Sequence, residues 1–128
     1  MAGTITFTPM DSKDKTMTSI VVDFTADASD ASFPNDESYR IDGFITNAYF
    51  VPGATAPTTG FDVTVEWLGV DLLGGAGADI VTSANALISP ANTAGDIQYA
   101  GFVGNITPKA INNSVNSATF KLILIVAR

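Results

Sequence analysis

The sequence predicts an all-β domain, a single antiparallel β-sandwich or a jelly-roll-like barrel of about seven to eight strands. Three observations lead to this fold class. Apolar and polar residues alternate with a period of two in several segments, and glycine and proline recur at short intervals. No stretch keeps apolar residues at the spacing i, i+3, i+4 and i+7 that an amphipathic helix requires. The pattern therefore favours short strands joined by turns.

Residues 61–67 show the alternation most clearly. Successive side chains of a strand point to opposite faces, so this segment has one apolar face and one polar face. The inward face carries Phe61, Val63, Val65 and Trp67, and the outward face carries Asp62, Thr64 and Glu66. Residues 20–25 follow the same rule, with Ile20, Val22 and Phe24 on the apolar side.

About seven strands are expected along the chain, separated by residues that favour turns, such as Pro34 and Pro52-Gly53. No internal repeat or low-complexity linker divides the sequence, and 128 residues suffice for one core, so we expect one domain over residues 1–128. The expected strands span residues 4–8, 17–26, 39–51, 61–68, 97–104, 105–111 and 118–127, with a further short strand around Ala86–Ser89.

The last expected strand differs from the others because it is apolar on both faces after Lys121. One interpretation is a central strand that is buried on both sides. The other is that one face, carrying Ile123 and Ile125, meets a neighbouring subunit. The sequence leaves both open.

The chain contains no histidine and no cysteine. This excludes Ser-His-Asp and Cys-His nucleophilic sites, imidazole general bases and the usual zinc sites. Carboxylate catalysis needs two acids in one cleft. Asp62 and Glu66 share a strand face, but four strand residues separate them by about 13 Å on open surface. We therefore expect no enzymatic activity, no catalytic residues and no cofactor.

Acidic residues are concentrated in the polar segment of residues 26–38, which we expect to be an exposed loop. Asp27, Asp30, Asp36 and Glu37 provide oxygen ligands of the kind that Ca²⁺ prefers, but their spacing does not match an EF-hand loop, and the required glycine is missing. We expect a solvated loop and no metal site, with calcium as the alternative.

The run Gly74-Gly75-Ala76-Gly77 superficially resembles a phosphate-binding loop. It lacks the Lys-Ser/Thr of a P-loop and the spacing of a dinucleotide fingerprint. In an all-β chain it predicts a turn or bulge where two backbones approach closely.

Four aromatic residues are candidates for a sugar-binding groove, because aromatic faces stack on pyranose rings: Tyr39, Tyr49, Trp67 and Tyr99. Trp67 falls on the inward phase of its strand, however, and tyrosines commonly cap a core with the hydroxyl in water. We expect these side chains to pack in or around the core.

The formal net charge is −7 at pH 7, with only six basic residues, and these are scattered along the chain. Polyanion binding requires clustered Lys and Arg, so nucleic acid and anionic membranes are not expected partners. The N-terminal residues lack the pattern of a signal peptide, and no apolar run approaches the ~20 residues of a membrane-spanning helix. Charged residues make up only 15% of the chain, which predicts a surface that other proteins cover.

Two neighbouring segments carry a family resemblance. Residues 52–65 begin Pro52-Gly53-Ala54-Thr55-Ala56-Pro57-Thr58 and lead into an alternating strand, and residues 69–78 read Gly-Val-Asp-Leu-Leu-Gly-Gly-Ala-Gly-Ala. This resembles small structural proteins of tailed bacteriophages, in which a P-G-x-x-A-P-T loop precedes a strand and a V-D-L/V-L-G-G-x-G turn. The start at residues 4–9 and the aliphatic C-terminal strand also fit that pattern.

The resemblance implies a virion structural protein, made in the host cytoplasm and located on the particle. The leading expectation is a capsid decoration (cement) protein that binds the outer capsid surface and stabilises it. Its expected partners are the major capsid protein or other virion proteins, and further copies of itself. The alternatives are a head–tail connector, tail or fibre component, or a carbohydrate-binding β-sandwich module.

Overall fold

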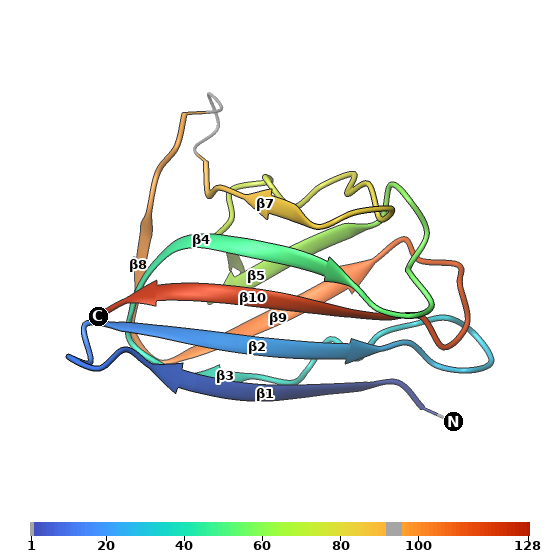
Figure 1. Cartoon of the computed structure of the whole chain (residues 1–128), viewed down its shortest axis with the longest axis horizontal. Coiled ribbons are helices and arrows are strands. Elements are labelled where there is room, and N and C mark those ends of the chain that lie inside the picture. Colours follow the sequence, from blue (N-terminus) through green and yellow to red (C-terminus); the bar gives the residue numbers. More distant parts are fainter. Residues whose placement is uncertain (1, 92–95) are drawn as a thin grey trace.

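The computed structural model describes residues 2–91 and 96–128, so residue 1 and residues 92–95 of the expected domain lie outside the described residues. The described chain is all-β and forms two antiparallel sheets that pack as a sandwich (Figure 1). No helix in the described ranges is long and apolar enough to cross a membrane. The strands are β1 (Thr4–Asp11), β2 (Met17–Thr25), β3 (Tyr39–Arg40), β4 (Gly43–Pro52), β5 (Asp62–Trp67), β6 (Val70–Asp71), β7 (Ala86–Ile88), β8 (Ala100–Phe102), β9 (Asn105–Ile111) and β10 (Thr119–Ala127).

The larger sheet has six strands in the order β1-β2-β10-β4-β7, and β8 also pairs with β4. The smaller sheet has the order β3-β9-β5-β6. The first and last long strands therefore lie close together, because β10 inserts between β2 and β4 in the middle of the larger sheet (Figure 1). The all-β sandwich expected from the sequence is confirmed, with more strands than the seven to eight expected.

The core lies between the sheets and is built from the apolar phase of each strand. Its centre is a group of stacked and edge-to-face phenylalanine rings around Phe120 of β10. The Phe120 ring centroid lies 4.4 Å from that of Phe24 and 5.1 Å from that of Phe61. Phe61 directly precedes β5, so these contacts join the two sheets. Aromatic pairs of this kind add about 0.5–1.5 kcal/mol each beyond their buried area.

The alternation predicted for residues 61–67 is confirmed in β5. Phe61, Val63 and Val65 are buried in the core. Trp67 is half-buried and packs against the core at the end of the strand, where its indole Nε1 donates a hydrogen bond to the Val103 carbonyl at 2.9 Å. Trp67 therefore points to the core side as predicted, although it packs at the edge of the core and not at its centre.

The single strand expected over residues 39–51 is wrong. The chain forms β3 in the smaller sheet, leaves it after Arg40, and enters the larger sheet as β4 at Gly43. Asp42 fixes this crossing, because its carboxylate accepts the backbone N–H of Gly104 at 2.8 Å. Gly43 has a φ of 152°, and a Cβ there would meet the Ala127 carbonyl of β10. Local alternation cannot reveal such a change of sheet.

Two other expected strands differ clearly in extent, and one short strand is new. Of the strand expected over residues 97–104, only Ala100–Phe102 is a strand. The strand expected over residues 4–8 continues to Asp11 through Pro9, which is possible because β1 is an edge strand. The short β6 was not expected at all.

The Gly-rich segment forms a turn with close backbone approach, as expected. Gly74 and Gly75 have φ values of 63° and 86°. A Cβ on Gly74 would overlap the Ala91 carbonyl. The turn is held by Asp71, whose carboxylate accepts the backbone N–H groups of Val65 at 3.1 Å, Leu73 at 3.0 Å and Gly75 at 2.9 Å. The Val-Asp-Leu-Leu-Gly-Gly motif is thus a turn-forming unit.

Candidate interaction surface

The larger sheet has a side that faces away from the smaller sheet, and we call this side the outer face. Strand register aligns one row of residues across it. Thr8 pairs with Val21, Val21 with Ile123, Ile123 with Tyr49, and Tyr49 with Leu87. Directly paired residues point to the same side of a sheet. An uninterrupted row without a charged group therefore runs across all five strands of the main path.

The residues around this row extend the apolar surface. Ile125 lies next to Ile123 on the outer face, beside Ser19 and Asn47. Exposed apolar members include Met10 (72%), Leu87 (61%), and Met17 and Tyr49 (39% each). One row away on the outer face, Asp23 and Lys121 form an ion pair with each other. Contiguous exposed apolar patches of this kind mark interaction sites.

The structure excludes the first of the two interpretations of the last strand, burial on both sides. β10 is central in its sheet, but only one of its faces is fully buried. Leu122 and Leu124 have no exposed area and belong to the core, whereas Ile123 and Ile125 are half-buried on the outer face. The strand is therefore not buried on both sides, and its second apolar face is available to a partner.

A groove of about 490 Å³ indents the outer face where β1 and β2 join. Its lining is mainly apolar and includes Met10, Met17, Tyr49 and Ile125. Polar residues also line it: Asp11, Ser12, Thr18, Ser19 and Asn47. A groove whose exposed surface is mainly apolar, with polar groups among it, has the composition of a binding site for a segment that carries apolar side chains.

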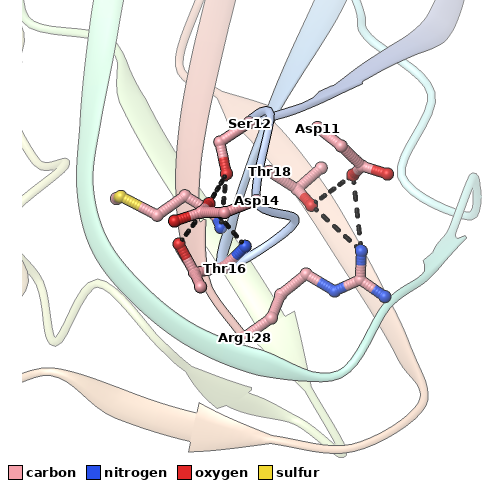
Figure 2. A network of polar contacts seen from close by, with 7 residues as sticks. Asp11, Ser12, Asp14, Thr16, Thr18 and Arg128 are labelled. Atoms are coloured by element: carbon pink, nitrogen blue, oxygen red, sulfur yellow. Dashed lines mark hydrogen bonds and ion pairs between the residues drawn. The ribbon is translucent and has the colours of Figure 1, made fainter.

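Ser12 of the β1–β2 turn lines this groove, and hydrogen bonds hold the turn together (Figure 2). The carboxylate of Asp14 accepts hydrogen bonds from the Thr16 hydroxyl at 2.7 Å, the Ser12 hydroxyl at 2.8 Å and the Thr16 backbone N–H at 3.1 Å. The Thr16 hydroxyl bond is the largest cause of a lowered pKa for Asp14. The turn therefore keeps its shape while the carboxylate is ionised.

A second polar network stands beside the turn, also visible in Figure 2. Thr18 is buried, and its hydroxyl donates to the Asp11 carboxylate at 2.7 Å. Arg128 contacts both groups, with its Nη1 3.4 Å from Asp11 Oδ1 and 3.4 Å from Thr18 Oγ1. The ends of β1, β2 and β10 are thereby tied together.

The two carboxylates considered for catalysis serve separate structural contacts. Asp62 accepts the backbone N–H of Asp79 at 2.9 Å and a hydrogen bond from the Asn112 side chain. Glu66 forms an ion pair with Lys109 at 3.0 Å. The clefts that we describe include neither of them.

The acidic segment uses two of its carboxylates to hold its own backbone. Asp27 accepts the Ser29 hydroxyl at 2.6 Å and backbone N–H at 2.7 Å, and the hydroxyl bond is the largest cause of the lowered pKa of Asp27. Asp30 accepts hydrogen bonds from the Ser32 hydroxyl at 2.7 Å and the Ser32 backbone N–H at 3.0 Å. Within residues 2–91 and 96–128, no group of three metal-ligating side chains is assembled, and Asp36 and Glu37 do not join Asp27 and Asp30 in one.

The aromatic residues considered for sugar binding do not share a groove. Tyr39 packs against the core and stacks on Phe7, with ring centroids 5.3 Å apart, as expected for a core-capping residue. The same expectation is wrong for Tyr49, which lies on the outer face, and for Tyr99, which is 56% exposed. Trp67 borders a different hollow from Tyr39 and Tyr49.

Sequence reasoning identified Ile123 and Ile125 but missed Met10, Met17, Tyr49 and Leu87. Their gathering depends on which strands are neighbours, and this is not readable from local alternation. A usable signal was present, however. The outward positions of residues 17–25, 43–52 and 119–127 hold few charges for strands that should face water.

Three comparisons with known proteins complete the description. No protein-family model, no curated protein and no solved structure matches this chain. The residues of the outer face and their neighbours therefore carry the functional interpretation.

Proposed function

We propose that this chain is a structural protein of a bacteriophage particle, a capsid decoration protein that binds the capsid shell through its outer face and stabilises it. The observation that carries the proposal is the uncharged apolar row from Val21 through Ile123 and Tyr49 to Leu87. A binding role accounts for this row, whereas a free domain would be expected to carry charges there. We infer that the particle is a bacteriophage from the resemblance of residues 52–78 to phage structural proteins.

A sheet face suits such a role because it is stiff before it binds. β2, β10 and β4 are each hydrogen-bonded on both sides, so little backbone order has to be gained on docking. Stable interfaces bury about 800 Å² on each partner. Apolar area contributes roughly 25 cal/mol per Å², so a largely apolar contact of that size gives a substantial driving force before association costs are subtracted.

The charge of the chain fits a position outside the shell. A net charge of −7 disfavours contact with packaged DNA, which is itself a polyanion. The partner we propose is the major capsid protein, with other copies of this chain at neighbouring sites. No catalytic activity, metal or cofactor is part of the proposal.

The test is depletion and reconstitution of the source particle. Particles stripped of this protein should stay assembled but rupture more readily on heating, and adding the protein back without divalent ions should restore resistance. Equal resistance of stripped and intact particles would contradict the decoration role and favour a connector, tail or fibre position. Saturable glycan binding by the free protein, without attachment to shells, would favour the carbohydrate-binding alternative.

Variants make the reconstitution specific for the outer face. The double variant Ile123→Thr/Leu87→Thr should remain folded and attach at least tenfold more weakly, since about 1.4 kcal/mol of lost binding energy is tenfold in affinity. The matched control is Val81→Thr/Ile111→Thr, because these exposed apolar residues lie elsewhere (60% and 56% exposed). Equal attachment of both double variants would place the contact on another surface.

A further inference from the structure

A second cleft, of about 620 Å³, lies where the end of β1 meets β3 and the connection to β4. Both arginines of the chain, Arg40 and Arg128, line it, although the sequence has only six basic residues. Two aspartates, Asp11 and Asp42, line it as well. What the cleft can bind depends on which of these four charged groups already have partners within the chain.

Both carboxylates are already engaged within the chain. Asp11 accepts the Thr18 hydroxyl at 2.7 Å and contacts Arg128 at 3.4 Å, as Figure 2 shows. Asp42 accepts the Gly104 backbone N–H at 2.8 Å. The guanidinium of Arg40, in contrast, makes no hydrogen bond or ion pair with any residue in the described ranges. The formal charges of the two arginines and two aspartates cancel, and the guanidinium of Arg40 offers the cleft its unused donors.

The backbone at Arg40 is held in place by packed and hydrogen-bonded neighbouring residues. Tyr39 beside it is half-buried and stacks on Phe7 of β1. The register of β3 with β9 places Arg40 opposite Asn105. A guanidinium has a planar fork of N–H donors that matches the two oxygens of a carboxylate. Arg40 is thus presented on ordered backbone toward the cleft.

The cleft adjoins the apolar groove of the outer face, because Asp11 and Thr18 border both. A ligand that spans the two would place apolar groups against Met10 and Met17 and an anionic group at Arg40. We propose that the cleft binds an acidic side chain of the protein partner, from a segment in which a Glu or Asp is adjacent to apolar residues. This inference rests on the proposed function and specifies the chemistry of the partner.

The direct test uses a defined probe, the acetylated and amidated peptide Leu-Glu-Leu-Glu-Leu, titrated into the full chain at low salt and followed by NMR. Arg40→Gln should weaken its binding about tenfold, the loss expected for a charge-assisted bidentate contact. Arg40→Lys keeps the charge but loses the planar fork of donors, so its affinity for the peptide should lie between those of the unmodified chain and Arg40→Gln. Lys13→Gln is the control, since it removes the same charge at a residue that lines neither the cleft nor the groove.

The outcomes separate this inference from the proposed function. Weaker binding in Arg40→Gln but not in Lys13→Gln, together with loss on replacing Glu by Gln in the peptide, supports the acidic-segment site. Equal effects of both variants, or no peptide binding, overturn it. Binding of glucuronate at Arg40 in place of the peptide overturns the protein partner in favour of an acidic sugar. If particle attachment depends on Ile123 and Leu87 but not on Arg40, the proposed function stands and the acidic-segment site fails.

Discussion

The two faces of β10 provide the sharpest test of the structure, because adjacent residues on one strand should respond oppositely to the same substitution. Leu122 and Leu124 have no exposed area, whereas Ile123 and Ile125 are half-buried on the outer face. We compare two double variants, Ile123→Thr/Ile125→Thr and Leu122→Thr/Leu124→Thr. Threonine is a good strand former, so the backbone preference is conserved in both.

The expected losses follow from burial. At the outer positions, replacing Ile by Thr removes about two carbon groups that are half-buried, worth about 1 kcal/mol per site at ~0.8 kcal/mol per buried methylene. At the inner positions, losing a buried Leu side chain costs about 2–5 kcal/mol, and an unpaired buried hydroxyl adds about 1–3 kcal/mol. The inner double variant therefore loses at least ~6 kcal/mol, comparable to the whole stability of a small domain.

Urea denaturation followed by far-ultraviolet circular dichroism distinguishes the two cases. The outer double variant should unfold cooperatively with a loss of about 2 kcal/mol, and the inner double variant should be unfolded without denaturant. Similar losses in both variants would mean that the strand phase is wrong and that Ile123 and Ile125 belong to the core. The apolar outer face, and the function proposed from it, would then have to be abandoned.

Three further predictions concern other parts of the fold. Trp67→Ala should cost about 2–3 kcal/mol in urea denaturation, below the ~3–5 kcal/mol of a fully buried aromatic, because Trp67 is half-buried; a loss under ~1 kcal/mol would contradict its contact with the core. Gly75→Ala should reduce the free energy of unfolding by about 1 kcal/mol, because alanine is strained at the left-handed φ. Gly74→Ala should reduce it by about 3 kcal/mol or more, because its Cβ would also overlap the Ala91 carbonyl. Equal losses in the two variants would refute the close approach. The lowered pKa of Asp27 contributes stability that is present above its unfolded-state value of 3.8 and is lost as the pH falls through the folded-state pKa. Asp27→Asn should therefore reduce the difference in stability between neutral pH and about pH 2. An unchanged difference in denaturation midpoints would count against the Ser29 contact.

The sequence predicted the fold class and most strands because both depend on local pattern. Residues 61–67 alternate strictly, and their buried phase is the one expected. Changes of sheet were not predictable in this way. The crossing between Arg40 and Gly43 is fixed by the contact of Asp42 with Gly104, 62 residues away in sequence. Periodicity contains no information about such a partner.

The candidate site was predictable only in part, for the same physical reason. Ile123 and Ile125 stood out because a strand with two apolar faces is unusual for a two-layer sandwich. Tyr49 and Leu87 belong to strands whose neighbours were unknown, so nothing placed them beside Ile123. Arg40 and Arg128 are 88 positions apart, and only the fold brings both to one cleft.

The residues on which the proposed phage resemblance rests have a different role from those of the proposed site. Asp71, Gly74 and Gly77 are explained by the turn alone, since Asp71 satisfies three backbone N–H groups and the glycines admit neighbouring carbonyls. A motif made of such residues specifies a local fold and leaves the binding chemistry of the rest of the chain free to vary. The informative residues for function are then those that the fold does not need. Leu87 is 61% exposed and Arg40 is unpaired in the described chain, so both are accessible to the partner that we propose.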